Sequence, residues 1–190
     1  MKRRTRLNFS SIIMMLGALL LAVGPVAQRA WAGPDDDNAN VNNLLDQAQY
    51  QAERLARDTN AMTGQIRSDV SWQALSDQLV RERAHVNDLG KLIHQLQSSR
   101  IDASRWQKES IDRVVPLLQD VANDTTDQIE YLNKHESSFY APRFHKWANQ
   151  NAKLSHEFAG MVTDIVQYGK DRAELARLRD NLDQPNIASK

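Results

Sequence analysis

The chain has 190 residues, no cysteine, and equal numbers of acidic and basic residues, 24 of each. The lack of cysteine excludes a disulfide framework, a lipid-anchored lipoprotein and covalent haem attachment through a Cys-x-x-Cys-His motif. Apolar burial alone must therefore stabilise the fold. A chain of about 150 residues can achieve this, because folding buries roughly 70% of its surface.

The first 32 residues have the pattern of an export signal. A basic start precedes an apolar stretch at residues 12–23, and the sequence Ala-Trp-Ala at residues 30–32 is a small-x-small cleavage site. The apolar stretch is too short to span a bilayer. We therefore expect residues 1–32 to be a cleaved signal peptide and the mature chain, residues 33–190, to be periplasmic or secreted, with no transmembrane segment. Two adjacent arginines near the start leave twin-arginine export open beside the favoured general secretion route.

Cleavage of this signal would change the charge of the protein. Five basic residues and no acidic residue lie in residues 1–32, so the mature chain carries a net charge of about −5. An acidic balance argues against general nucleic-acid binding, which needs a basic surface. It suits a soluble protein of the envelope or the extracellular space.

Apolar residues of the mature chain recur at alternating steps of three and four, which is the spacing of amphipathic helices. The four segments with this pattern are residues 41–62, 70–98, 103–136 and 141–183, between an acidic, disordered lead-in at 33–40 and a disordered tail at 184–190. They predict an all-α fold, an up-down-up-down antiparallel four-helix bundle over residues 41–183 with long third and fourth helices. Pro116 lies on the outward face of the third helix, where we expect a kink rather than a break.

The last predicted helix has the longest regular pattern. We expect its inward-facing residues to be Phe144, Trp147, Asn151, Leu154, Phe158, Met161, Ile165, Tyr168, Arg172, Leu175, Arg179 and Leu182. The two arginines interrupt the apolar pattern, so we expect this end to open to solvent and fray. Counting outward from the turn near Tyr140 places Gln128 level with Asn151. This amide pair is predicted to fix the register of the third and fourth helices.

The turn between the third and fourth helices is the predicted contact surface. Because these helices are expected to be longer than the first two, residues 129–149 should project beyond the bundle. Aromatic and basic residues gather there in an otherwise acidic chain: Tyr131, Phe139, Tyr140, Arg143, Phe144, Lys146 and Trp147. A projecting aromatic patch is typical of contact with a partner, a membrane surface or a ligand. The alternative is that these rings close the core over the end of the hairpin.

Glu82-x-x-His85 is the best candidate for a metal-binding pair. Ferritin-like di-iron bundles bring two such motifs and two further glutamates together in the core. The chain has no second motif, so we expect Glu82 to lie at the edge of the core and to pair with Arg81, Arg83 or a neighbouring helix. Non-covalent haem needs a core-facing histidine, and only His135, near a helix end, lies on a predicted core face. We expect no cofactor and no catalytic site, because the sequence has no local Ser/His/acid cluster and no glycine-rich phosphate loop.

Together, these patterns predict an exported, soluble helical bundle that acts as an interaction or structural module of the bacterial envelope. It would bind a protein partner and would not be an enzyme. The competing function class is a bundle that binds a small ligand, haem or a metal. A third alternative is a homodimer that forms through the projecting part of the long helices.

Overall fold

The computed structural model describes residues 37–68, 70–135 and 142–183. The contacts divide the chain into two units, Met1–Ala32 and Gly33–Lys190, and every described residue belongs to the second. Within the described residues there are helices and no strands. The helices are α1 (Ala39–Arg67), α2 (Trp72–Ser99), a single 3₁₀ turn η1 (Arg100–Asp102), α3 (Arg105–Lys134) and α4 (Pro142–Asp183).

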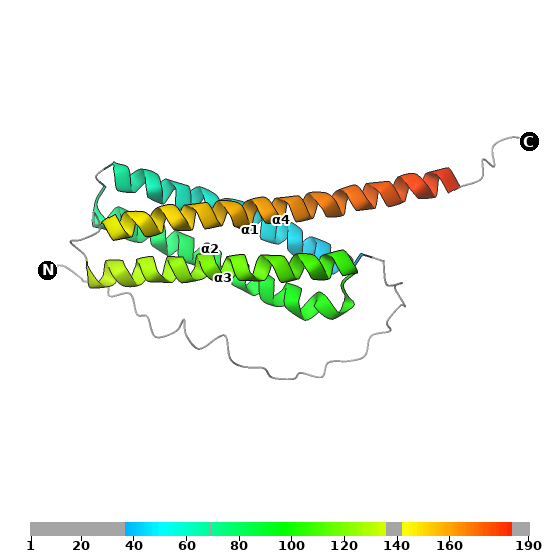
Figure 1. The fold of residues 1–190 in the computed structure, drawn as a ribbon, viewed down its shortest axis with the longest axis horizontal. Coiled ribbons are helices and arrows are strands. Elements are labelled where there is room, and N and C mark those ends of the chain that lie inside the picture. The colour runs from blue at the N-terminus through cyan, green and yellow to red at the C-terminus, as the bar shows by residue number, and fades with distance from the viewer. Residues whose placement is uncertain (1–36, 69, 136–141, 184–190) are drawn as a thin grey trace, which may run out of the picture. The chain divides into compact units, whose positions relative to one another are not determined.

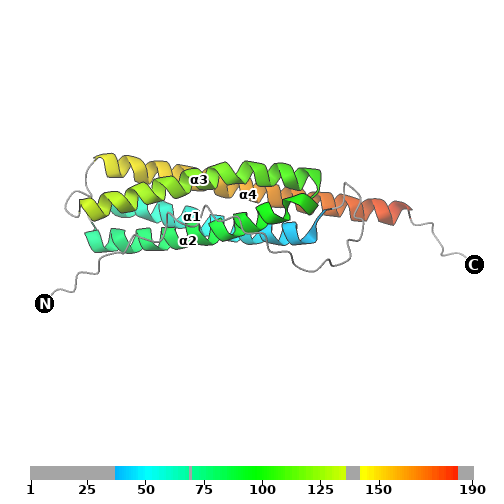
Figure 2. The ribbon, with the colours of Figure 1, turned by 90° about the horizontal axis from the view of Figure 1, so that it is seen from below.

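The four α-helices run antiparallel in sequence order, so the predicted up-down-up-down bundle is confirmed (Figures 1 and 2). Helix α1 packs mainly against α2 and α4, and α3 packs against the same two helices. None of these helices combines the length and the apolar character that crossing a membrane requires. Helix α3 passes through the exposed Pro116 as one continuous helix.

The lead-in is more structured at its end than we expected, because α1 begins at Ala39 rather than Val41. Asn38 caps it, with Oδ1 accepting hydrogen bonds from the backbone N–H of Asn40 (2.9 Å) and of Val41 (3.2 Å). A side-chain acceptor at this position pairs N–H groups that have no partner within the helix. The predicted tail at 184–190 lies outside the described residues.

The core-facing side of α4 differs from the predicted one. Met161 and Ile165 are only half-buried and Tyr168 is exposed, whereas the smaller residues one position along the chain are buried. The buried residues of α4 are Phe144, Ala148, Asn151, Ala152, Ser155, Phe158, Ala159, Val162, Val166 and Gly169. Helix α1, which packs against α4, also buries small residues, at Ala48, Ala52 and Ala56. Small side chains allow two helix backbones to approach closely, so alanines occupy core positions that we had assigned to larger residues.

The projecting part of the bundle is also not where we predicted it. Helix α3 has 30 residues, close to the 29 of α1 and the 28 of α2, and only α4 is long, with 42. Both views show α4 extending past the other helices at its C-terminal end, beside the starts of α1 and α3 (Figures 1 and 2). The extra length therefore lies at the end of the bundle opposite to the α3–α4 connection.

Candidate functional site

The middle of the bundle contains a group of buried polar side chains, which we call the polar layer. Its centre is Glu82 of α2, Thr125 of α3 and Asn151 of α4, each at most 2% exposed. Asn151 Nδ2 donates a hydrogen bond to Thr125 Oγ1 (3.1 Å) and lies 3.4 Å from Glu82 Oε2. Gln128 and Ser155 lie about one turn away along α3 and α4, and both are buried. The polar layer therefore joins α2, α3 and α4 in the interior of the bundle.

Several oxygens of the polar layer lack a hydrogen-bond partner within the described residues. They are Glu82 Oε1, Gln128 Oε1, Asn151 Oδ1 and Ser155 Oγ, all inaccessible to solvent. A buried polar atom without a partner lowers stability by about 1–3 kcal/mol. These unpaired oxygens therefore lower the stability of the fold.

Glu82 is fully buried, rather than placed at the edge of the core as we predicted. Burial raises the pKa of its carboxyl group to about 8, and the nearby negative charge of Asp58 adds to this effect, while Gln78 and Arg81 oppose it. At neutral pH the side chain is therefore mostly protonated and uncharged. A neutral carboxyl group can occupy a core position that a carboxylate could not. The expected pairing with an arginine is not needed to keep it there.

His85 is directed to a different neighbour from Glu82. Its Nε2 lies 3.0 Å from Asp58 Oδ2 and its Nδ1 lies 3.2 Å from Gln51 Oε1, both on α1. Glu82, by contrast, contacts Asn151 of α4. The structure does not bring these two candidate ligands to one point. In the part of the chain that the structure describes, no three His, Cys, Asp or Glu side chains are grouped so that they could hold a metal ion.

The predicted pairing of Gln128 with Asn151 is wrong by one helical turn. Asn151 bonds Thr125 of α3, while Gln128 Nε2 donates to the backbone oxygen of Asp124 in its own helix (3.2 Å). Helix α3 ends at Lys134 and α4 begins at Pro142. The midpoint of the connection therefore lies earlier than Tyr140, from which we had counted.

The hairpin end of α3 and α4 contains a cluster of packed rings. Phe144 is fully buried, and its ring centre lies 6.1 Å from that of Tyr131. The rings of Tyr131 and Trp147 meet in a T-shaped arrangement, with their centres 5.4 Å apart. The guanidinium of Arg143 lies 4.5 Å from the centre of the Trp147 ring. Arg143 and Lys146 are exposed. Of the predicted contact residues, Phe139 and Tyr140 lie outside the described residues, and Phe144 belongs to the core.

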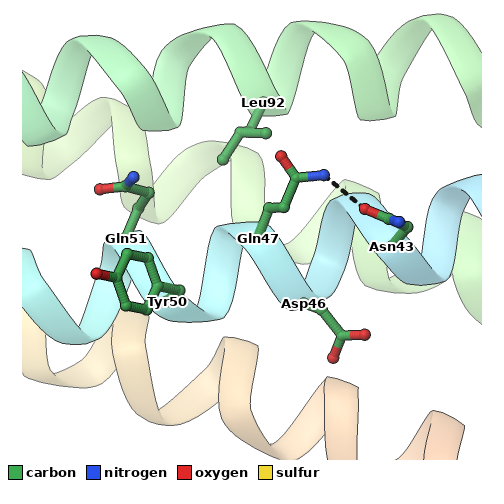
Figure 3. Close-up of a pocket in the computed structure, with 6 residues that line it drawn as sticks. All are labelled: Asn43, Asp46, Gln47, Tyr50, Gln51 and Leu92. Atoms are coloured by element: carbon green, nitrogen blue, oxygen red, sulfur yellow. Dashed lines mark hydrogen bonds between the residues drawn. The ribbon is translucent and has the colours of Figure 1, made fainter.

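A shallow groove of about 430 Å³ lies on the surface between α1 and α2. Figure 3 shows its lining: Asn43, Asp46, Gln47, Tyr50 and Gln51 from α1, and Leu92 from α2. The amides of Gln47 and Asn43 bond each other, and the carboxylate of Asp46 lies 3.5 Å from Lys170 of α4. The side chains in this groove therefore bond mainly to their neighbours, and none of them is a buried charged group.

The end of the bundle where α1 and α3 begin, opposite to the hairpin end of α3 and α4, holds a second group of polar side chains. We call it the Gln107 junction, and it is formed by Asn38, Asn42, Ser104 and Gln107. Gln107 Oε1 accepts hydrogen bonds from the backbone N–H of Asn38 and of Ser104, both at 3.0 Å. Its Nε2 donates to Asn38 O (3.0 Å) and to Asn42 Oδ1 (2.7 Å). This side chain ties the start of α1 to the start of α3. We did not single it out in the sequence, although Ser104-x-x-Gln107 is the spacing of a capping box.

Beside the Gln107 junction, the indole of Trp106 closes this end of the bundle. Its Nε1 donates a hydrogen bond to Asp37, and its ring forms a T-shaped contact with Tyr168, with the ring centres 5.3 Å apart. Gly169 lies directly under the ring, because a Cβ atom at this position would come within 2.9 Å of Trp106. Helix α4 can pass this close only because residue 169 has no side chain.

Beyond this point α4 continues as a single exposed helix, the α4 extension, residues 173–183. Every residue from 173 to 182 is exposed, including three leucines: Leu175 (66%), Leu178 (46%) and Leu182 (85%). We expected this end to fray, but α4 remains helical to Asp183. The leucines share one helix face, and no described part of the chain covers them.

The chain matches no family model, no curated protein and no solved structure in the comparisons with known proteins. The polar layer, the hairpin end and the α4 extension are therefore interpreted from the chemistry of this chain alone. Among them, only the α4 extension exposes a contiguous apolar face.

Proposed function

We propose that the protein is an exported helical bundle that acts as an interaction or structural module of the bacterial envelope, with the α4 extension as its contact element. The observation that carries the proposal is the row of exposed leucines at 175, 178 and 182. An isolated helix of about ten residues is marginal in water, and most helical stability comes from packing of its apolar face. A partner that covers this face would supply that packing.

The α4 extension is preferred to the hairpin end as the contact element. At the hairpin end Phe144 is buried, and the rings of Tyr131 and Trp147 pack against each other rather than standing free. On the α4 extension the leucines are exposed. An exposed apolar row on a helix is a common recognition element, because it can be laid into a groove or against a second helix. The export part of the proposal is supported by the basic start, the apolar stretch and the Ala-Trp-Ala sequence of residues 1–32.

Two measurements in cells test this proposal: photo-crosslinking tests the contact element, and intact-mass measurement tests export. A photoreactive amino acid replaces Leu178 in one strain and, as the control, Val80 of α2 in another, because these two apolar side chains are almost equally exposed, at 46% and 47%. We expect a discrete crosslinked product from position 178 and little or none from position 80. Intact-mass measurement of the periplasmic fraction should give a chain that begins at Gly33. Equal labelling at the two positions, or a chain that retains residues 1–32 in the cytoplasm, would contradict the proposal.

A further inference from the structure

We infer that the partner of the α4 extension is the α4 extension of a second copy of this chain, paired in parallel as a short two-stranded coiled coil. This inference rests on the proposal that the extension is a contact element. It names the partner and the direction in which the two helices run.

The leucine spacing fits a heptad. Leu175, Leu178 and Leu182 are separated by three and then four residues, so they occupy positions a, d and a of successive heptads. Tyr168, at the preceding a position, is 49% exposed. Asp171 occupies the d position between them and is bonded by Gln167 of the same helix (2.8 Å). The apolar contact would therefore be strongest over the three leucines and weaker toward the bundle.

The flanking charges favour a parallel pair over an antiparallel one. In this register Glu174 occupies a g position and Arg179 the following e position. In a parallel coiled coil a g residue faces the e residue five positions later in the partner, so two Glu–Arg pairs would form by symmetry. An antiparallel pair brings e residues of the two helices together, and both e positions here, 172 and 179, are arginines. Glu174 already accepts hydrogen bonds from Arg177 of its own helix (2.7 and 3.0 Å), but a carboxylate can accept further hydrogen bonds.

The leucine row also faces away from the bundle, so the described residues leave room for a second helix beside it. Leu175 follows the buried Val166 by nine residues, and Leu178 follows the buried Gly169 by the same number. Nine residues correspond to about two and a half turns. The leucines therefore lie on the side of α4 opposite to its core-facing side. In a parallel pair the two bundles would lie on the outer sides of the paired helices.

Disulfide trapping tests the pairing directly, because the chain has no native cysteine. In a parallel pair each a position faces itself, so mature Leu182→Cys should form a covalent dimer under mild oxidation. Ala173→Cys is the control, since residue 173 is exposed at an f position on the outer side of the pair. Equal dimer formation by the two variants would indicate random collision and overturn the inference. A dimer that forms only when Leu175→Cys and Leu178→Cys proteins are mixed would show antiparallel pairing and overturn it as well.

Charge exchange gives an independent measurement. Sedimentation across a concentration series should show a weak dimer, because three leucine layers form an interface below the usual size for a stable complex. Glu174→Arg should raise its dissociation constant about fivefold, and adding Arg179→Glu should restore it. No restoration in the double variant would contradict the parallel register. If the protein is a monomer at every concentration while photo-crosslinking at position 178 captures a different protein, self-pairing is wrong and the contact role stands. If position 178 captures nothing, both proposals are wrong.

Discussion

Gln107 and Glu82 are both completely buried, yet their surroundings differ in kind. Gln107 uses both atoms of its amide in four hydrogen bonds of 2.7–3.0 Å. Within the polar layer, Glu82 makes a long contact of 3.4 Å to Asn151, and its Oε1 has no hydrogen-bond partner among the described residues. Equal burial thus has opposite consequences, because a fully bonded polar group stabilises a fold and a partly bonded one destabilises it.

The position of each group along the bundle explains this difference. Gln107 lies where α1 and α3 begin, and the first N–H groups of a helix have no partner within it. Its Oε1 pairs the backbone N–H groups of Asn38 and Ser104, which precede the helices and have no partner within them. Glu82 lies in the middle of the bundle, where backbone groups are already bonded within their helices. Few backbone groups are therefore open to the polar layer, and four of its side-chain oxygens have no partner among the described residues.

The largest expected effect comes from the protonation of Glu82. Its pKa is about 8 in the folded protein, against an ordinary value of 4.5, so folding takes up a proton between these two pH values. The stabilising contribution of the neutral form is complete below pH 4.5 and is lost as the pH rises through about 8. The free energy of unfolding should fall by up to about 5 kcal/mol across this range. Urea unfolding from pH 4 to pH 9 measures this fall.

Glu82→Gln should remove this component, because glutamine has the shape of the protonated side chain and does not ionise. The variant should match the natural protein near pH 4.5 and exceed its stability near pH 9. Asp58 acts on Glu82 and also contacts His85, so the difference between the two proteins, rather than either curve alone, isolates Glu82. Glu109→Gln, at a side chain that is 57% exposed, is the matched control and should leave the curve unchanged. If the free energy of unfolding changed with pH in the same way for the natural protein and for Glu82→Gln, Glu82 would be ionised in the folded state.

The second-largest effect is expected at the Gln107 junction. Gln107→Ala removes four hydrogen bonds, leaves backbone groups of Asn38 and Ser104 unpaired and opens a small cavity, so the free energy of unfolding should fall by about 3 kcal/mol. Gln119→Ala, at an exposed position of the same helix, is the control and should change stability by less than about 0.5 kcal/mol. Unlike the effect at Glu82, this loss should be the same at pH 5 and at pH 9. A loss no larger than that of Gln119→Ala would mean that the junction is not stabilising.

The sequence was sufficient to predict the four helices and their antiparallel order, because apolar residues at alternating steps of three and four mark a helix face independently of its neighbours. It was not sufficient to predict which face of α4 enters the core. Met161, Ile165 and Tyr168 are the larger apolar residues, but Ala159, Val162 and Val166 are buried instead. Which face of α4 is buried depends on how closely α1 packs against it, and this distance is set by the side chains of both helices. A 3.5-residue repeat also drifts around a straight helix of 3.6 residues per turn by about 20° per heptad, so Leu175 and Leu182 lie far from the core face on which Phe144 lies.

Candidate sites were harder to predict, because they depend on register between helices. We placed Glu82 at the edge of the core, whereas it is fully buried, and its contact with Asn151 depends on where α3 turns into α4. The hydrogen bonds of Gln107 join residues almost 70 positions apart in the chain, and only its spacing from Ser104 could have indicated them. Protonation in the core, likewise, depends on neighbours from other helices.

The smallest effects provide the most direct comparison between the two polar regions, because the same substitution should have opposite signs in them. Ser155 and Ser104 are both buried, but Ser155 Oγ has no partner among the described residues while Ser104 Oγ donates to Asp37 Oδ1 (3.0 Å). Ser155→Ala removes an unpaired hydroxyl inside a helix and should raise the free energy of unfolding by about 1 kcal/mol. Ser104→Ala removes a bonded group directly before α3 and should lower it by about 1 kcal/mol. The change in side-chain volume is identical in the two variants, so only the hydrogen bonding of the two serines differs. Denaturation curves that shift in the same direction would mean that this difference in bonding has no effect on stability. Opposite shifts would locate the instability of the fold in the polar layer around Glu82.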